Sequence, residues 1–276
     1  MTRRPTPFRI THCLRHATLL MLAFPTVFPC LAQTTSGDAN MPSASSATDL
    51  ADEASPASLE PTPSVPQQKI PPALTHYRGR EIATTMHYTG APWLIREERQ
   101  REEDCTKMLE QLNVQRGMTV CDMGCGNGFY TLQLAERVGT EGRVLAVDIQ
   151  PEMLRLLQER AATAGLKNVL PIHGSVIDPG LPKAQVDLIL CVDVYHEFSH
   201  PEQMLAAMRA SLKPDGELVL VEFRGEDPSV PIKPLHKMTK KQVLREMQPN
   251  GLQLSRQFDD LPWQHMMFFR KSTETP

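Results

Sequence analysis

A glycine-rich turn is the segment of this chain best suited to chemistry. Asp122–Gly128 reads Asp-Met-Gly-Cys-Gly-Asn-Gly, at the end of the apolar run Thr119–Met123 and before a stretch with helical spacing. Glycines let the backbone turn sharply and approach a ligand closely, and the free N–H groups at the start of the next helix suit a carboxylate or phosphate. Asp148 ends the next strand-like run, where its carboxylate could accept both hydroxyls of a ribose. This order of strand, turn, helix, strand and acid predicts a site for a nucleoside-containing cofactor.

A second motif indicates different chemistry. His196–His200 reads His-Glu-Phe-Ser-His and matches the H-E-x-x-H signature of zinc peptidases. That chemistry needs both histidines one turn apart on a helix, with the glutamate as base. Here the segment leaves a predicted strand directly, and His200 precedes Pro201, which disfavours helical angles. We therefore expect no metal site and keep a zinc peptidase as the least favoured alternative.

The spacing of apolar residues predicts the elements that position these motifs. An amphipathic helix closes near Gly117, and a later helix is capped by Thr239. Between them, helical stretches alternate with strands at 119–123, 143–147, 168–172, 186–192 and 217–222, and a strand pair follows at 252–258 and 264–270. This alternation predicts an α/β fold with a doubly wound, mostly parallel, Rossmann-like sheet of seven strands that ends in an antiparallel pair. Ligands of such sheets bind at the carboxyl ends of the strands.

The glycine motif also points to a family. It lacks the third glycine of the dinucleotide fingerprint, because Phe129 stands there. With the motif order and the added strand pair, the chain resembles the class I S-adenosylmethionine-dependent methyltransferases over about residues 100–270. The resemblance implies S-adenosylmethionine as cofactor, its methionine half at the glycine turn, its ribose at Asp148 and its sulfonium beside Cys191–Tyr195. The cofactor-binding residues expected on this basis are Asp122, Gly124, Cys125, Gly126, Asn127, Gly128, Asp148, Ile149, Ser175, Val176 and Asp193.

Methyl transfer would require the protein mainly to align donor and acceptor and to remove a proton from an oxygen or nitrogen acceptor. His196, just past the fourth strand, is the expected catalytic base; a histidine bonded only to the backbone is the alternative. Asp193 is expected to orient the methionine amino group, or else to cap a turn. Glu222 and His236 are further candidates for the cleft.

The methyl acceptor is left open between a small molecule and a protein. Two other functions remain alternatives. One is an NAD(P)-dependent oxidoreductase, which Phe129 disfavours. The other is a cofactor-binding module without catalysis.

Composition divides the chain. Of its 24 prolines, 11 precede residue 73, whereas only Gly37 of its 15 glycines does. Residues 1–32 combine a basic start, the apolar run Ala17–Phe28 and a small-residue cleavage site, which predicts a signal peptide and export to the periplasm or medium; a misassigned leader would leave the protein in the cytoplasm. Residues 33–72 are rich in Ser, Ala, Thr and Pro and predict a disordered linker.

Residues 73–276 form the expected methyltransferase domain, with an N-terminal lid segment at about 73–100 whose Tyr77, Tyr88 and Trp93 would face the sulfonium or pack on the core. The net charge of -3 gives no basic field for nucleic acid. No membrane span is expected in the mature chain, and the oligomeric state is not predicted. The cysteines of this part are expected to be buried thiols.

Overall fold

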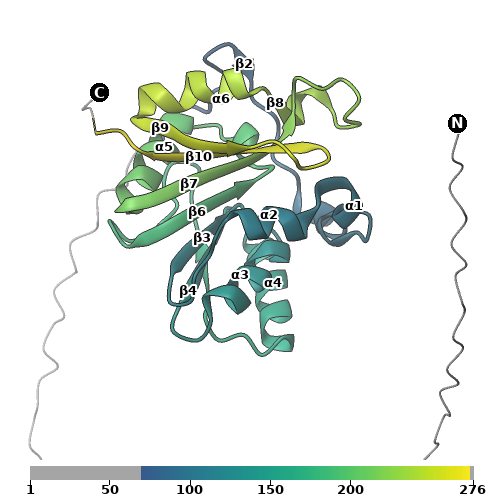
Figure 1. The fold of residues 1–276 in the computed structure, drawn as a ribbon, viewed down its shortest axis with the longest axis vertical. Coiled ribbons are helices and arrows are strands. Elements are labelled where there is room, and N and C mark those ends of the chain that lie inside the picture. Colours follow the sequence, from purple (N-terminus) through teal and green to yellow (C-terminus); the bar gives the residue numbers. More distant parts are fainter. Residues whose placement is uncertain (1–69, 274–276) are drawn as a thin grey trace, which may run out of the picture. The chain divides into compact units, whose positions relative to one another are not determined.

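A twisted sheet forms the centre of the part of the chain that the computed structural model describes, residues 70–273. The predicted leader, and the predicted linker up to residue 69, lie outside the described residues. The sheet has eight strands in the order β5-β4-β3-β6-β7-β10-β9, with β8 paired to β7 (Figure 1). The strands are β3 (Thr119–Met123), β4 (Arg143–Asp148), β5 (Val169–His173), β6 (Val186–Val192), β7 (Leu212–Arg224), β8 (Lys237–Met238), β9 (Leu252–Phe258) and β10 (Gln264–Lys271).

Pairing in this sheet is parallel except at β10, which runs antiparallel to both β7 and β9. β5 lies at the other edge and carries Pro171, a residue that strands tolerate at edges because it cannot donate to a ladder. The predicted doubly wound, mostly parallel sheet with a terminal antiparallel pair is confirmed.

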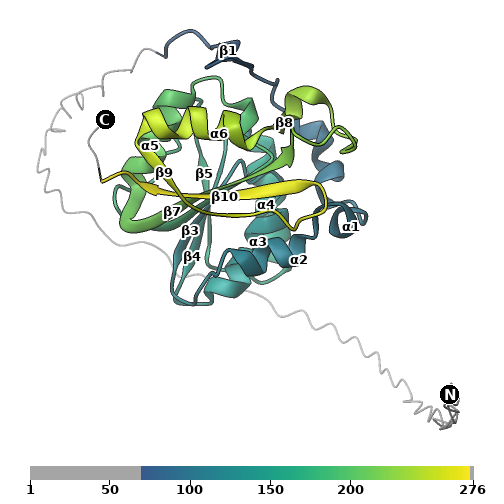
Figure 2. The same ribbon diagram turned by 45° about the horizontal axis from the view of Figure 1, so that its top comes forward.

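Helices cover both faces of the sheet. Figures 1 and 2 show α5 (Pro201–Ser211) and α6 (Lys240–Met247) on one side, and α2 (Cys105–Gln111), α3 (Phe129–Val138) and α4 (Pro151–Thr163) on the other. Alternate residues of a strand face opposite sides. Val144 therefore belongs to the apolar cluster that includes α2 and α3, whereas its neighbour Leu145 belongs to the cluster that includes α5 and α6. The four cysteines of the described part, Cys105, Cys121, Cys125 and Cys191, are free and buried, as expected.

Three elements differ from the sequence-based expectation. The helix predicted to close near Gly117 is α2, which begins at Cys105 and already ends at Gln111. The charged run before it forms a separate helix, α1 (Arg99–Glu103), and Asp104 between the two is in the left-handed region at φ +49°. Asp tolerates this conformation, and its carboxylate caps α2 by accepting from the Lys107 N–H. β7 begins at Leu212 rather than residue 217, because Leu212 already pairs with Val186 across a register shift.

The third difference is β8, which lies where the apolar spacing predicted no strand. Lys237 and Met238 pair in parallel with Phe223 and Arg224 at the carboxyl end of β7. This pairing brings residues 234–238 back to the edge of the sheet at which β7 ends.

A buried ion pair fastens the segment that precedes α1. This segment contains the two-stranded sheet of β1 (His76–Tyr77) and β2 (Arg80–Glu81), and the 3-10 helix η1 (Tyr88–Ile95). The Arg80 guanidinium donates to both carboxylate oxygens of Glu246 on α6, at 2.8 and 3.1 Å, and to the His196 carbonyl at 2.7 Å. Glu246 is fully buried and also accepts from the Tyr195 hydroxyl at 2.8 Å.

Residues 70–273 contain no helix long and apolar enough to span a membrane.

Substitution of Arg80 by Met should lower the free energy of unfolding by about 3–5 kcal/mol, because it leaves the Glu246 charge buried without its cation. Arg155→Met is the matched control, since Arg155 pairs with Glu159 at a similar 2.7 Å but both side chains are about 60 % exposed, and an exposed pair contributes about 0–1 kcal/mol. Denaturant unfolding measures the loss of unfolding free energy in each variant. Equal losses for the two variants would contradict this account.

Candidate active site

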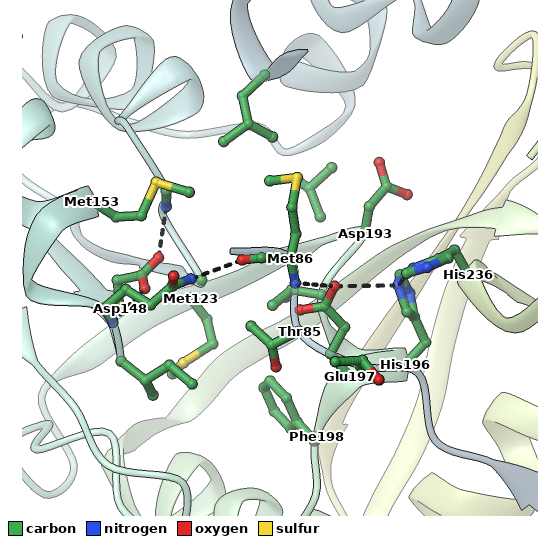
Figure 3. A pocket seen from close by; sticks show the side chains of 18 of the residues that line it. Thr85, Met86, Met123, Asp148, Met153, Asp193, His196, Glu197, Phe198 and His236 are labelled. Carbon is green, nitrogen blue, oxygen red and sulfur yellow. Dashed lines mark hydrogen bonds and ion pairs between the residues drawn. The ribbon is translucent and has the colours of Figure 1, made fainter. Parts of the chain in front are cut away.

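A cavity of about 720 Å³ lies at the carboxyl ends of the central parallel strands. Its floor comes from residues at or just after β3, β4, β6 and β7, and its sides from residues 84–86, 93–94 and 231–236. Figure 3 shows side chains from these separate parts of the chain converging on one space. Its size is within the range of pockets that bind small molecules.

Two glycines of the predicted turn line this pocket, Gly124 and Gly126. Both have left-handed backbone angles, with φ of +68° and +53°. A Cβ on Gly126 would lie 2.6 Å from the Leu94 side chain, and one on Gly124 would lie 2.4 Å from that of Val194. Glycine is therefore required at these positions by both backbone conformation and space.

Asp148 connects the glycine turn to β4. Its Oδ2 accepts from the Gly126 N–H and its Oδ1 from the Gln150 N–H, both at 2.9 Å. Burial raises the pKa of the Asp148 carboxyl above its ordinary value, against the effect of these bonds. Each oxygen keeps a second lone pair, so the carboxylate can still accept hydroxyl groups from a ligand in the pocket.

The structure divides the predicted cofactor residues into two groups. Asp122, Cys125, Asn127 and Gly128 are absent from the pocket lining. Asp122 instead accepts from the Thr131 hydroxyl at 2.5 Å, and Asn127 donates to the Ala91 carbonyl at 2.9 Å. Their contact with a cofactor stays a prediction. The predicted residues that do line the pocket are Gly124, Gly126, Asp148, Ile149, Ser175, Val176, Asp193 and the predicted base His196.

Asp193 lines the pocket and has one buried carboxylate oxygen without a hydrogen-bond partner among the described residues. Its backbone is left-handed, with φ +50°, and its Oδ2 accepts from the Gln264 side-chain amide at 2.7 Å. Its Oδ1 is buried and has no hydrogen-bond partner among residues 70–273. Burial, and then the nearby charges of Glu103 and Glu222, raise the pKa of this carboxyl well above its ordinary value. A positively charged N–H donor would satisfy this oxygen and stabilise its charged form.

His196 lies on the short 3-10 helix η2 (Tyr195–Glu197) and is held by a buried carboxylate. Its Nδ1 lies 2.7 Å from Glu222 Oε2, and its Nε2 lies 3.1 Å from Nδ1 of His236. Figure 3 shows His196 beside His236. Burial alone lowers the pKa of His196, but Glu222 outweighs it and the net pKa is raised. Because the carboxylate can only accept, Nδ1 carries the proton and Nε2 of the neutral ring is left to interact with other groups.

The second histidine of the His-Glu-Phe-Ser-His motif is elsewhere. His200 is buried, bonded to the Pro71 carbonyl and the Ser199 hydroxyl at 2.9 Å each, and does not line the pocket. The segment forms one 3-10 turn before α5 rather than a helix. His196 and His200 therefore do not share a helical face, and the zinc-peptidase arrangement is not formed. His236 lies beside His196 instead.

Some pocket residues were not anticipated from sequence. Arg99 is buried beside the glycine turn, with its guanidinium bonded to Glu103 at 2.6 Å and to the Leu94 carbonyl at 2.8 Å. Nothing in its charged run distinguishes it from its exposed neighbours. Glu197 lines the pocket 4.0 Å from His196 Nε2, and burial raises its pKa to about 7.

Of the aromatic residues expected in the lid, only Trp93 lines the pocket. The Arg96 guanidinium stacks on its ring at 3.7 Å. Tyr77 is buried away from the pocket, with its hydroxyl 3.3 Å from Glu202 on α5.

Asp122 provides a test of the buried acid below the glycine turn. Burial raises the pKa of Asp122 to about 6, whereas an unfolded Asp has a pKa of about 3.9. Its protonation therefore stabilises the fold fully below about pH 4, and this contribution is lost as the pH rises through about 6. Asp122→Asn cannot titrate and keeps an oxygen acceptor for Thr131. Between about pH 4 and about pH 7, its unfolding free energy relative to the original protein should rise by about 1–3 kcal/mol. Denaturant unfolding across this range measures the change, and a difference independent of pH would contradict the assignment.

Comparison with known proteins agrees with the resemblance. Residues 114–266, more than half of the chain, match a family model described as a methyltransferase domain. Demethylmenaquinone methyltransferases from Listeria monocytogenes serotype 4a (strain HCC23) and Geobacillus stearothermophilus are 29 % and 30 % identical over 123 and 115 residues. These matches cover 45 % and 42 % of this chain and 51 % and 49 % of the relatives, so the chain spans about half the length of the curated relatives it matches.

Solved structures resemble the described fold. A SAM-dependent methyltransferase from Aquifex aeolicus has a TM-score of 0.63 and 26 % identity, covering 67 % of this chain and 98 % of that one. A putative type 11 methyltransferase from Sulfolobus solfataricus, at 19 % identity and TM-score 0.52, shares the fold, covering 63 % of this chain and 96 % of that one. The chain therefore belongs to the methyltransferase domain family, among the class I S-adenosylmethionine-dependent methyltransferases.

Proposed function

We propose that this protein transfers the methyl group of S-adenosylmethionine to a small-molecule or protein acceptor bound in the same pocket. The observation that carries the proposal is the combination of the glycine turn with carboxylates at one cavity: Asp148 and Asp193 line it, and Glu222 lies directly behind His196. The cofactor carries a positive sulfonium and a positive amino group, which negative side chains attract in a partly buried site. The pyrophosphate of NAD(P) would be repelled by the same groups, which disfavours the oxidoreductase alternative.

The cofactor would lie along the edge formed by β3, β4 and β6. Asp148 would accept from the ribose hydroxyls, and Ile149 and Val176, which line the pocket next to it, would contact the adenine. The unpartnered Oδ1 of Asp193 would accept from the methionine amino group. Arg99, which also lines the pocket, would attract the methionine carboxylate.

The acceptor would lie towards His196. An acceptor oxygen or nitrogen attacks the methyl carbon, the carbon–sulfur bond breaks, S-adenosylhomocysteine leaves, and the acceptor proton passes to Nε2 of His196. Glu222 supports this step because it holds Nδ1–H and stabilises the imidazolium that forms. The pocket is also lined by Phe198, Met204 and Phe223, which suits an apolar acceptor. The named activity of the curated relatives makes a quinone-type ring one candidate.

The Asp148→Ala variant should bind S-adenosylmethionine about 5- to 150-fold more weakly, because a charged hydrogen-bonding group contributes about 1–3 kcal/mol. Calorimetric titration measures the affinity, and thermal unfolding of the same variant shows whether the glycine turn has lost its anchor at Gly126. Asp259→Ala, at an exposed position outside the pocket, should bind the cofactor with unchanged affinity.

Two results would refute the proposal. One is unchanged cofactor affinity in Asp148→Ala, which would refute the ribose contact. The other is preferential binding of NAD, which would refute methyl transfer. Labelled methyl groups should also pass from the cofactor to a component of cell extract, and Asp148→Ala should reduce this transfer.

We also propose that the protein is exported. Support comes from residues 1–32, whose basic start and apolar run precede a cleavage site before Gln33. Sequencing the amino terminus of protein purified from its native cells should give a start near Gln33. An intact Met1 would exclude cleavage there.

A further inference from the structure

Three side chains at one end of the pocket bring metal-binding atoms together. His196 Nε2, one carboxylate oxygen of Glu197 and one ring nitrogen of His236 all lie within 4.8 Å of one another. They come from η2 and from η3 (Pro234–His236), about 40 residues apart, and Figure 3 shows them close together at one side of the pocket. The proposed methyl transfer uses only the first of these groups.

The spacing is close to that of a zinc site. Tetrahedral zinc with bonds of about 2.0–2.2 Å holds its ligand atoms about 3.3 Å apart. His196 Nε2 lies 3.1 Å from His236 Nδ1 and 4.0 Å from Glu197 Oε1. The Glu197 oxygen must therefore move towards the two histidine nitrogens, from which it lies no more than 4.8 Å. The Met86 N–H donates to its Oε1 at 3.3 Å, a long bond that permits such a shift.

Glu222 prepares His196 for this role. A histidine that binds a metal through one nitrogen usually donates its other N–H to a carboxylate, which fixes the tautomer and the ring orientation. The 2.7 Å contact between His196 Nδ1 and Glu222 Oε2 is such an arrangement. With Glu197, it places two carboxylates at the cluster, whose charges together balance a dication.

We propose that His196, Glu197 and His236 bind a divalent first-row transition metal ion, with a fourth position open to the pocket. Two imidazoles and one carboxylate, with one open position, are the donor set of catalytic zinc sites and suit related borderline ions. The hydrogen of the His196–His236 bond is released when the ion binds, since both ring nitrogens must be unprotonated. The site differs from the zinc-peptidase pattern because Glu197 is a ligand and His236 replaces His200.

An oxygen or nitrogen atom of the methyl acceptor would occupy the open position of the metal ion. This part of the inference rests on the proposed methyl transfer. With the ion bound, His196 Nε2 cannot accept a proton. The ion would instead lower the pKa of the bound acceptor atom, whose proton would leave to solvent. His196 as a base and the metal ion would both help the acceptor to lose its proton. A measurement of methyl transfer alone would therefore not distinguish the two mechanisms.

Direct binding tests the proposal. Full-length protein without an affinity tag is stripped with a chelator and titrated with Zn²⁺ by calorimetry and with Co²⁺ by visible absorption. One ion should bind per chain, and Zn²⁺ should raise the thermal unfolding temperature. His236→Gln and Glu197→Gln should each weaken binding at least about tenfold. His236 ends the short 3-10 helix η3 and is partly exposed, and Glu197→Gln retains the shape of the side chain, so both variants should fold.

Two histidine variants are the matched controls. His200→Gln removes the second motif histidine, which bonds elsewhere, and His173→Gln removes an exposed histidine outside the pocket lining. Both should keep the affinity of the original protein. Absence of one-to-one binding, unchanged affinity in His236→Gln, or loss of binding in His200→Gln alone would overturn the proposal. Titration with S-adenosylmethionine is separate: cofactor binding without metal binding refutes only the metal site, and metal binding without cofactor binding refutes only methyl transfer.

Discussion

Burial of carboxylates at one edge of the sheet constrains both the fold and the pocket. Each of the four central parallel strands has an acid that is buried at least in part within two residues of its carboxyl end, and a buried carboxylate is costly unless a donor accompanies it. Each acid accordingly has its own donor, supplied by another element. The pairs are Asp122 with the Thr131 hydroxyl, Asp148 with the Gly126 and Gln150 N–H groups, Asp193 with the Gln264 amide, and Glu222 with the His196 ring.

These donors do not satisfy the edge completely. Oδ1 of Asp193 and Oε1 of Glu222 are buried acceptors without a partner in residues 70–273. The edge also holds several like charges close together, and the pKa values of Asp122, Asp148 and Asp193 are all raised, with burial as the largest cause. Such an edge favours ligands that bring positive charge or N–H donors. The excess of buried carboxylate oxygens at this edge therefore favours both the proposed sulfonium cofactor and the proposed metal ion.

Local patterns explain what could be predicted from the sequence. The glycine turn, Asp148 and the limits of β3, β6 and β9 depend on residues adjacent in the chain, and the structure has these strands where the apolar runs predicted them. Arg99 could not be recognised in this way, because its burial depends on the contact with Leu94 and Glu103. The pairing of β8 with β7 could not be recognised from the sequence either, because two residues are too few to show the alternating pattern of a strand.

The His-Glu-Phe-Ser-His segment shows why a short motif needs its backbone context. The zinc-peptidase interpretation presupposes a helix, in which residues four apart share one face. Here Phe198 is extended and His200 has φ of -132°, so the chain leaves the 3-10 turn before a second helical turn can form. Pro201 explains this, since it disfavours helical angles at the residue before it. The first two residues keep their side chains at the pocket, and the place of the second histidine is taken by His236. That residue arrives only because β8 pairs with the end of β7 directly after it, so the cluster is a product of the sheet rather than of the motif.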